Sequence, residues 1–127
     1  MHDRTLYEYA VVRLVPRVER EEFINVGVLL YCRKQRYADI LFYLDRERCS
    51  LLNSEIDLDQ ILGHLNSMKQ VCLGSREGGA LAQLDQTERF RWLTAKRSTL
   101  LQCSSVHPGL CIDAKTTHQE LFEKLVL

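Results

Sequence analysis

The sequence has no excess of charge of either sign. Its 127 residues include 17 lysines and arginines and 17 aspartates and glutamates, so the formal net charge is zero. Dedicated nucleic-acid-binding domains are usually basic. The balance therefore argues against nucleic-acid binding as the main function.

Long apolar runs are also lacking. No stretch approaches the ~20 apolar residues that a helix needs to span a bilayer. No signal-peptide pattern follows Met1, so we expect a cytoplasmic protein. Hydrophobic residues at 46% and charged residues at 27% are typical of a globular chain, and the length predicts one domain, residues 1–127.

Paired cysteines and a metal-binding pattern are missing as well. The five cysteines form no Cys-x-x-Cys motif and are irregularly spaced, which indicates reduced, mostly buried thiols. Cys103, His107 and Cys111 are evenly spaced, but a structural zinc site needs four ligands and the sequence offers no matching second pair. We therefore expect no metal and no other cofactor.

Familiar catalytic motifs are absent from the sequence. It contains no Gly-rich phosphate loop, no serine elbow and no metal-carboxylate motif. His107, with Glu8 or Asp113, is a candidate acid–base group, but a histidine beside a Pro-Gly turn is also typical of a loop-fixing hydrogen bond. The sequence leans against an enzyme and leaves the question open.

One apolar stretch is the centre of the predicted fold. Phe23–Cys32, FINVGVLLYC, is apolar at nearly every position, which predicts a central strand covered on both faces. Strict alternation places Val26 on the face opposite Gly27. Gly27 predicts a bulge or a close approach by backbone or ligand, and Asn25 is suited to fix the incoming loop or to contact a ligand.

The rest of the pattern predicts an α+β fold. Further strands are expected at Leu6–Val15, Ala38–Leu44, Ala80–Gln83 and Ser98–Cys103, and a loop at Ser104–Leu110. Helices are expected after Asp45, Asp57 and Asp85, and near Asp113 or Thr117, with Gly74 ending the second and Gly63 permitting its close packing. We predict a single compact domain with an antiparallel sheet of about four or five strands covered by three or four helices.

The most unusual segment is Glu88–Thr99, ERFRWLTAKRST, which combines four basic residues with the only tryptophan. Arginine forks suit phosphate or carboxylate groups. The candidate binding residues, with two from the first strands and one from the later loop, are Arg13, Asn25, Arg89, Arg97, Ser98 and His107. The alternatives are structural salt bridges and caps for Arg89, Arg97 and Ser98, a core position for Trp92, and solvated charges for Arg91 and Lys96.

Several segments together resemble a known family. They are Glu8-Tyr9 with Val11-Val12-Arg13, Phe23-x-Asn25-Val26-Gly27-Val28, Arg89-Phe90-x-Trp92-Leu93, Ser98-Thr99 and His107-x-Gly109. In order and spacing they resemble the small bacterial family catalogued as domain of unknown function 3037, from about Leu6 to Val126. Members are often encoded beside a HipA-like kinase, so the resemblance implies a partnership with such a kinase.

Two hypotheses follow for the function. The first is a non-enzymatic interaction module or adaptor of a HipA-like kinase. The second is a phosphate- or nucleic-acid-binding protein that uses the basic Arg/Ser/His cluster. Convergence of Arg13, Asn25, Arg89 and His107 on one concavity favours the second hypothesis, and a flat apolar patch favours the first.

Overall fold

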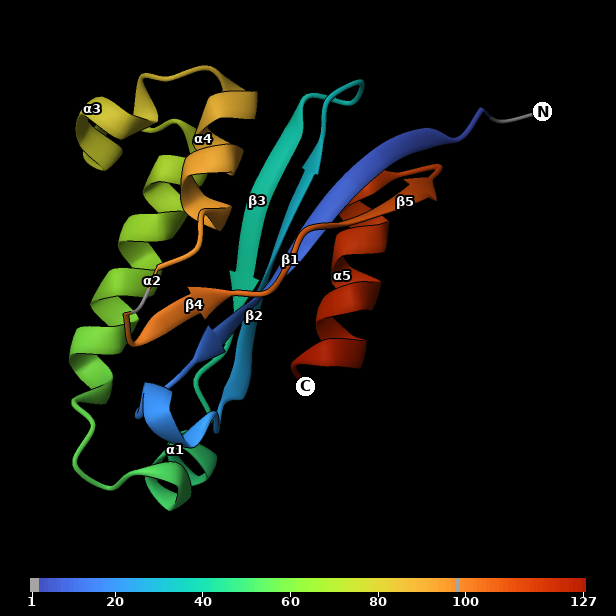
Figure 1. Cartoon of the computed structure of the whole chain (residues 1–127). Helices are drawn as coiled ribbons and strands as arrows, with labels where there is room; N and C mark the ends of the chain where they lie inside the picture. Colours follow the sequence, from blue (N-terminus) through green and yellow to red (C-terminus); the bar gives the residue numbers. More distant parts are fainter. Residues whose placement is uncertain (1–2, 98) are drawn as a thin grey trace.

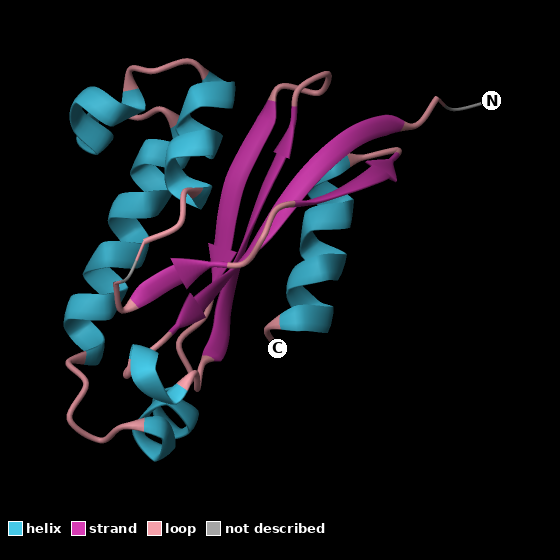
Figure 2. Cartoon of the chain, viewed as in Figure 1, coloured by secondary structure: helices cyan, strands magenta, loops and turns pink. Residues whose placement is uncertain are grey.

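The computed structural model describes residues 3–97 and 99–127, and within them five strands form one antiparallel sheet (Figures 1 and 2). The strands are β1 (Thr5–Leu14), β2 (Ile24–Cys32), β3 (Tyr37–Phe42), β4 (Leu101–Cys103) and β5 (His107–Cys111). β3, β2 and β1 are consecutive neighbours. β4 and β5 share the other edge of β1. β5 pairs with the first half of β1, and β4 pairs with its last three residues.

Five α-helices cover this sheet in the described part of the chain. They are α1 (Arg46–Leu52), α2 (Leu58–Leu73), α3 (Gly79–Ala82), α4 (Gln86–Thr94) and α5 (Ala114–Leu125). α2, α3 and α4 lie on one side of the sheet and α5 lies on the other (Figure 1). The predicted α+β class with an antiparallel sheet is confirmed.

The helix ends lie where the capping residues predict them. Asp45, Asp57, Asp85 and Asp113 each accept a hydrogen bond from a backbone N–H in the first turn of the helix that follows. These N–H groups have no partner within the helix, so a side-chain acceptor stabilises the end. Gly74 closes α2 in the left-handed conformation at φ 70°.

Two local predictions are wrong. Ala80–Gln83 is not a strand, because Ala80 to Ala82 belong to α3, whose strong helix formers pack Ala82 into the protein interior. Ser104–Leu110 is not wholly a loop, because β5 begins at His107 and pairs with the free edge of β1. A proline is tolerated in such an outer strand, where its missing N–H costs no ladder bond.

The β1–β2 ladder contains a bulge. Val12 lies opposite Gly27 and Arg13 lies opposite Asn25, so Val26 is an extra residue in β2. Val26 therefore packs in the same cluster as Leu29 and Tyr31, and the strict alternation predicted for this strand is wrong at this position.

Gly27 is also a point of close backbone approach between β2 and β3. A Cβ built on it would lie 2.9 Å from the carbonyl oxygen of Leu41 and 3.2 Å from Cβ of Phe42. Both readings of this glycine, a bulge and a close approach, are thus confirmed. Gly63 differs, because nothing lies within 4 Å of a Cβ built there, and the close packing predicted for it is wrong.

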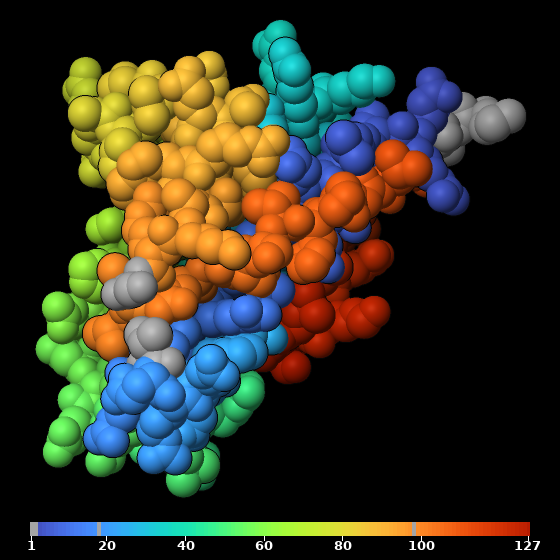
Figure 3. Space-filling view, viewed as in Figure 1, coloured from blue at the N-terminus to red at the C-terminus, as the bar shows by residue number. Residues whose placement is uncertain are grey.

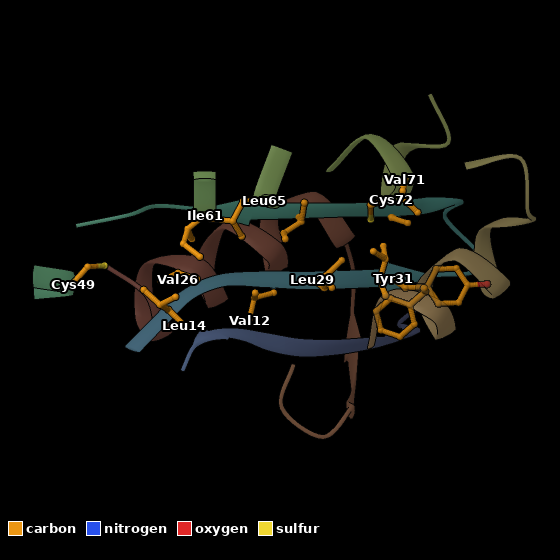
Figure 4. Close-up of a cluster of buried hydrophobic side chains, with 14 residues drawn as sticks. Val12, Leu14, Val26, Leu29, Tyr31, Cys49, Ile61, Leu65, Val71 and Cys72 are labelled. Atoms are coloured by element: carbon orange, nitrogen blue, oxygen red, sulfur yellow. The ribbon is translucent and has the colours of Figure 1, made fainter. Parts of the chain in front are cut away.

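The apolar side chains form two clusters, one on each face of the sheet. The larger lies between the sheet and α1, α2 and α4. Figure 4 shows side chains of α1 and α2 near those of β1 and β2 in this cluster. The smaller joins Leu30 and Cys32 to Cys111 and Ala114 on the α5 side. β2 contributes to both clusters, as its apolar sequence predicts.

On β3, which is an edge strand, side chains form hydrogen bonds with the backbone N–H and carbonyl groups of Ile40. Asp39 accepts a hydrogen bond from the N–H of Ile40 at 2.7 Å, and Nζ of Lys69 donates to the carbonyl oxygen of Ile40 at 3.1 Å. Lys69 and Asp39 also pair with each other at 3.0 Å. Charged side chains at an edge strand oppose pairing with another chain.

Alanine substitutions at Gly27 in β2 and at Gly63 in α2 distinguish the tightly packed glycine from the exposed one. Gly27→Ala is expected to lower the free energy of unfolding by about 1–3 kcal/mol, because its Cβ meets backbone that cannot yield easily. Gly63→Ala is the matched control and is expected to raise it by about 0.5–1 kcal/mol, since an exposed helix position gains propensity. Urea unfolding measures both. Equal effects of the two substitutions would contradict the tight approach at Gly27.

Candidate functional site

An apolar groove of about 650 Å³ lies between α2, α4 and the segment that leads into β4. We call it the Trp92 groove; its apolar lining includes Met68, Val71, Leu81, Trp92, Leu100 and Leu101. In the space-filling view the orange segment after α4 runs between green α2 and blue β1 (Figure 3). No segment of residues 3–97 or 99–127 fills the groove.

Trp92 forms an exposed wall of this groove. Its side chain is 40% exposed, and Leu100 nearby is 42% exposed. The guanidinium carbon of Arg97 lies 4.0 Å from the centre of the indole ring, and Nη2 of Arg97 donates to the carbonyl oxygen of Trp92 at 2.5 Å. The prediction that Trp92 is a core residue is therefore wrong, since Phe90 and Leu93 fill the core beneath it.

A second depression, which we call the basic hollow, adjoins the groove. It has a volume of about 390 Å³ and is lined by Arg13, Lys96, Arg97, Gln102 and residues 103–105. Within the described residues none of its three cations forms an ion pair. Nε of Arg13 is buried and has no hydrogen-bond partner among them, while its guanidinium lies 4.3 Å from the ring centre of Phe23.

The structure brings two of the predicted site residues, Arg13 and Arg97, to one depression, the basic hollow. Asn25 lies opposite Arg13 across the β1–β2 ladder, and its Nδ2 donates to the carbonyl oxygen of Leu125 at 3.1 Å. Asn25 thereby ties β2 to the end of α5. Ser98 lies outside the described residues.

Arg89 and His107 lie apart from the basic hollow. Nη1 of Arg89 donates to the carbonyl oxygen of Leu84 at 2.6 Å and its Nε donates to that of Cys72 at 3.4 Å, so Arg89 braces the connection between α2 and α4. His107 is exposed on β5, with its ring centre 5.4 Å from that of Tyr9. The five predicted residues that the structure describes therefore do not converge on one concavity, and a binding role for each of the six stays a prediction.

One predicted solvated charge is paired. Arg91 donates to both carboxylate oxygens of Glu8, at 2.9 and 3.0 Å, which links α4 to β1. The fork-to-fork geometry is the strong form of this interaction. The ion pair gives the strand residue Glu8 a charged partner, and it corrects the expectation that Arg91 is a solvated charge.

His118 was missed in the sequence. It is a fully buried residue of α5. Its Nε2 lies 2.7 Å from the carbonyl oxygen of Val28, and its Nδ1 lies 2.6 Å from the hydroxyl of Tyr37. The carbonyl only accepts, so Nε2 carries the hydrogen and Nδ1 accepts from Tyr37. Its spacing from Leu121, Phe122 and Leu125 follows the apolar stripe of the last helix, and that signal was available.

Burial shifts the pKa values of a histidine, a tyrosine and two cysteines of the interior in the direction that favours their neutral forms. Burial lowers the pKa of His118 and raises that of Tyr37. Burial also raises the pKa of Cys72 to about 12 and that of Cys103 to about 11. Thiols that stay protonated are poor nucleophiles. Among residues 3–97 and 99–127, no three His, Cys, Asp or Glu side chains gather as a metal site requires.

Comparison with known families supports the resemblance seen in the sequence. The family model described as "Protein of unknown function (DUF3037)" matches residues 9–126. The chain belongs to the DUF3037 family. Searches of curated proteins and of solved structures returned no match. In the described part of this DUF3037 chain, every helix is too short or too polar to cross a membrane.

The buried histidine predicts a dependence of stability on pH. The pKa of His118 lies below the usual 6.5 in the folded chain, so the unfolded chain binds more protons as the pH falls below that value. The free energy of unfolding is therefore expected to fall by up to about 1.4 kcal/mol per pH unit below about pH 6.5, until the folded pKa is reached. His118→Gln is expected to flatten this slope.

The control for this measurement is His64→Gln, because His64 is exposed on α2. Urea unfolding at a series of pH values from about 7 to 5 covers the window before most carboxylates titrate. The wild-type chain and His64→Gln should share one slope. A His118→Gln variant with that same slope would contradict the assignment.

Proposed function

We propose that this chain is a non-enzymatic interaction module that docks a partner protein in the Trp92 groove. The observation that carries the proposal is the exposed apolar wall of Trp92 and Leu100, at 40% and 42%, over a groove of about 650 Å³. Large exposed apolar surfaces mark interaction sites. Tryptophan is also enriched among the residues that dominate binding energy.

A HipA-like kinase is the partner we propose. The reason is the gene neighbourhood that the family resemblance implies. The dispersal of Arg89 and His107 away from the basic hollow supports a module over an enzyme, because a catalytic site needs its groups within hydrogen-bond reach of one another. In this proposal the chain acts as an adaptor that positions or restrains the kinase.

A second candidate function is binding of phosphate groups or nucleic acid at the basic hollow. It is favoured by the three cations Arg13, Lys96 and Arg97, which line one depression. The balanced net charge of the chain argues against it as the leading function.

Co-expression with the HipA-like kinase encoded beside a family member tests the leading proposal. The tagged chain is expected to retain the kinase through purification. Leu100→Glu should weaken the complex by about tenfold or more, because it places a charge in an apolar contact. Trp92→Ala should do the same through lost contact area.

Leu51→Glu is the matched control, since Leu51 is 84% exposed on α1 and does not line the groove. It should leave the complex intact. Circular dichroism checks that each variant is folded. Absence of any complex with the wild-type chain, or equal retention by all three variants, would contradict the proposal.

A further inference from the structure

The Trp92 groove and the basic hollow share a wall. Arg97, Gln102 and Cys103 line both depressions. Arg97 joins them chemically as well, because its guanidinium lies over the indole of Trp92 while its side chain borders the hollow. An occupant of the groove therefore has cationic groups immediately beside its apolar part.

The hollow is suited to an anion. Its lining holds three cations, and within the described residues no aspartate or glutamate contributes to it. Nε of Arg13 is a buried donor without a partner among those residues, and leaving a buried donor unsatisfied is unfavourable. A carboxylate accepts from such donors and from an arginine fork.

Two of the cations also influence the pKa of a neighbouring thiol, that of Cys103. Burial raises the pKa of Cys103 to about 11, while Arg97 and Arg13 both act to lower it. The two arginines come from different parts of the chain, the loop after α4 and β1. Arg13, Arg97 and Cys103 line the basic hollow together, and Arg97 and Cys103 also line the Trp92 groove.

We propose that the occupant of the Trp92 groove is an acidic peptide segment of the partner, with apolar side chains in the groove and a neighbouring carboxylate in the basic hollow. This inference rests on the proposed docking function and names its chemistry. The carboxylate meets the guanidinium groups of Arg13 and Arg97, with Lys96 at the rim. The apolar side chains lie against Trp92 and Leu100.

A peptide fits this surface better than a polynucleotide does. A polynucleotide would extend its charged phosphates along the apolar wall next to the hollow, at a cost in desolvation. It would also need an aromatic face for stacking. Arg97 already lies on the ring of Trp92, so stacking there requires that contact to be displaced.

Selection of short random peptides on the whole chain tests the inference. Peptides that combine apolar residues with Asp or Glu are expected to be enriched. One such peptide and its amide counterpart, with each acid replaced by Asn or Gln, are then titrated while the fluorescence of Trp92 is followed. Trp92 is the only tryptophan, so its emission reports on the groove directly.

The acidic peptide is expected to bind the wild-type chain about tenfold or more tightly than the amide peptide does, and to weaken with added salt. Arg13→Gln/Arg97→Gln should remove that difference. Lys96→Gln, at an exposed position, should reduce it and keeps the test valid if the double variant does not fold. Arg48→Gln, an exposed cation on α1, is the control and should preserve it.

Other outcomes would overturn the inference. Enrichment of apolar peptides without acids, or equal binding of the acidic and amide peptides, would leave groove docking intact and remove the acidic requirement. Failure to enrich any peptide would contradict both the docking function and its chemistry. A single-stranded oligonucleotide that quenches Trp92 more strongly than the peptides, and loses this effect in Arg13→Gln/Arg97→Gln, would assign the hollow to nucleic acid.

Discussion

The pairing of β1 with β2 around a bulge is the constraint on which the rest of the structure depends. One extra residue, Val26, turns into the larger core, and the register that follows sets Asn25 opposite Arg13. Asn25 can then bond the end of α5, while the pairing of β1 with β4 sets Arg13 opposite Gln102. A ladder without the bulge would set Val26 opposite Arg13 and turn the side chain of Asn25 to the opposite face.

The candidate site exists because α4 and β4 are both short where they meet the end of β1. α4 ends at Thr94 with the extended residue Ala95, and β4 contributes only three residues to the sheet. Ser104 continues the edge, since its N–H donates to the carbonyl oxygen of Val11 and its Oγ accepts from the Val11 N–H. The segment between α4 and β4 is thus held at both ends, with apolar and cationic side chains on its surface.

Local chemistry in the sequence predicts much of the fold and little of the site. The caps at Asp45, Asp57, Asp85 and Asp113 and the apolar β2 act over a few residues, so their patterns are readable. The burial of His118 was readable from its helical spacing. The exposure of Trp92 and the separation of Arg89 from Arg97 depend on where α4 ends against α2, which no local pattern encodes.

Site-specific photo-crosslinking tests most directly the central claim, that the Trp92 groove is the docking surface, and it uses the chain co-expressed with the HipA-like kinase that we propose as its partner. A photoreactive residue is placed at position 100 in one variant and at position 51 in another. The account predicts a cross-link to the kinase from position 100 and none from position 51. A cross-link from position 51 alone, or an intact complex that yields none from position 100, would contradict it.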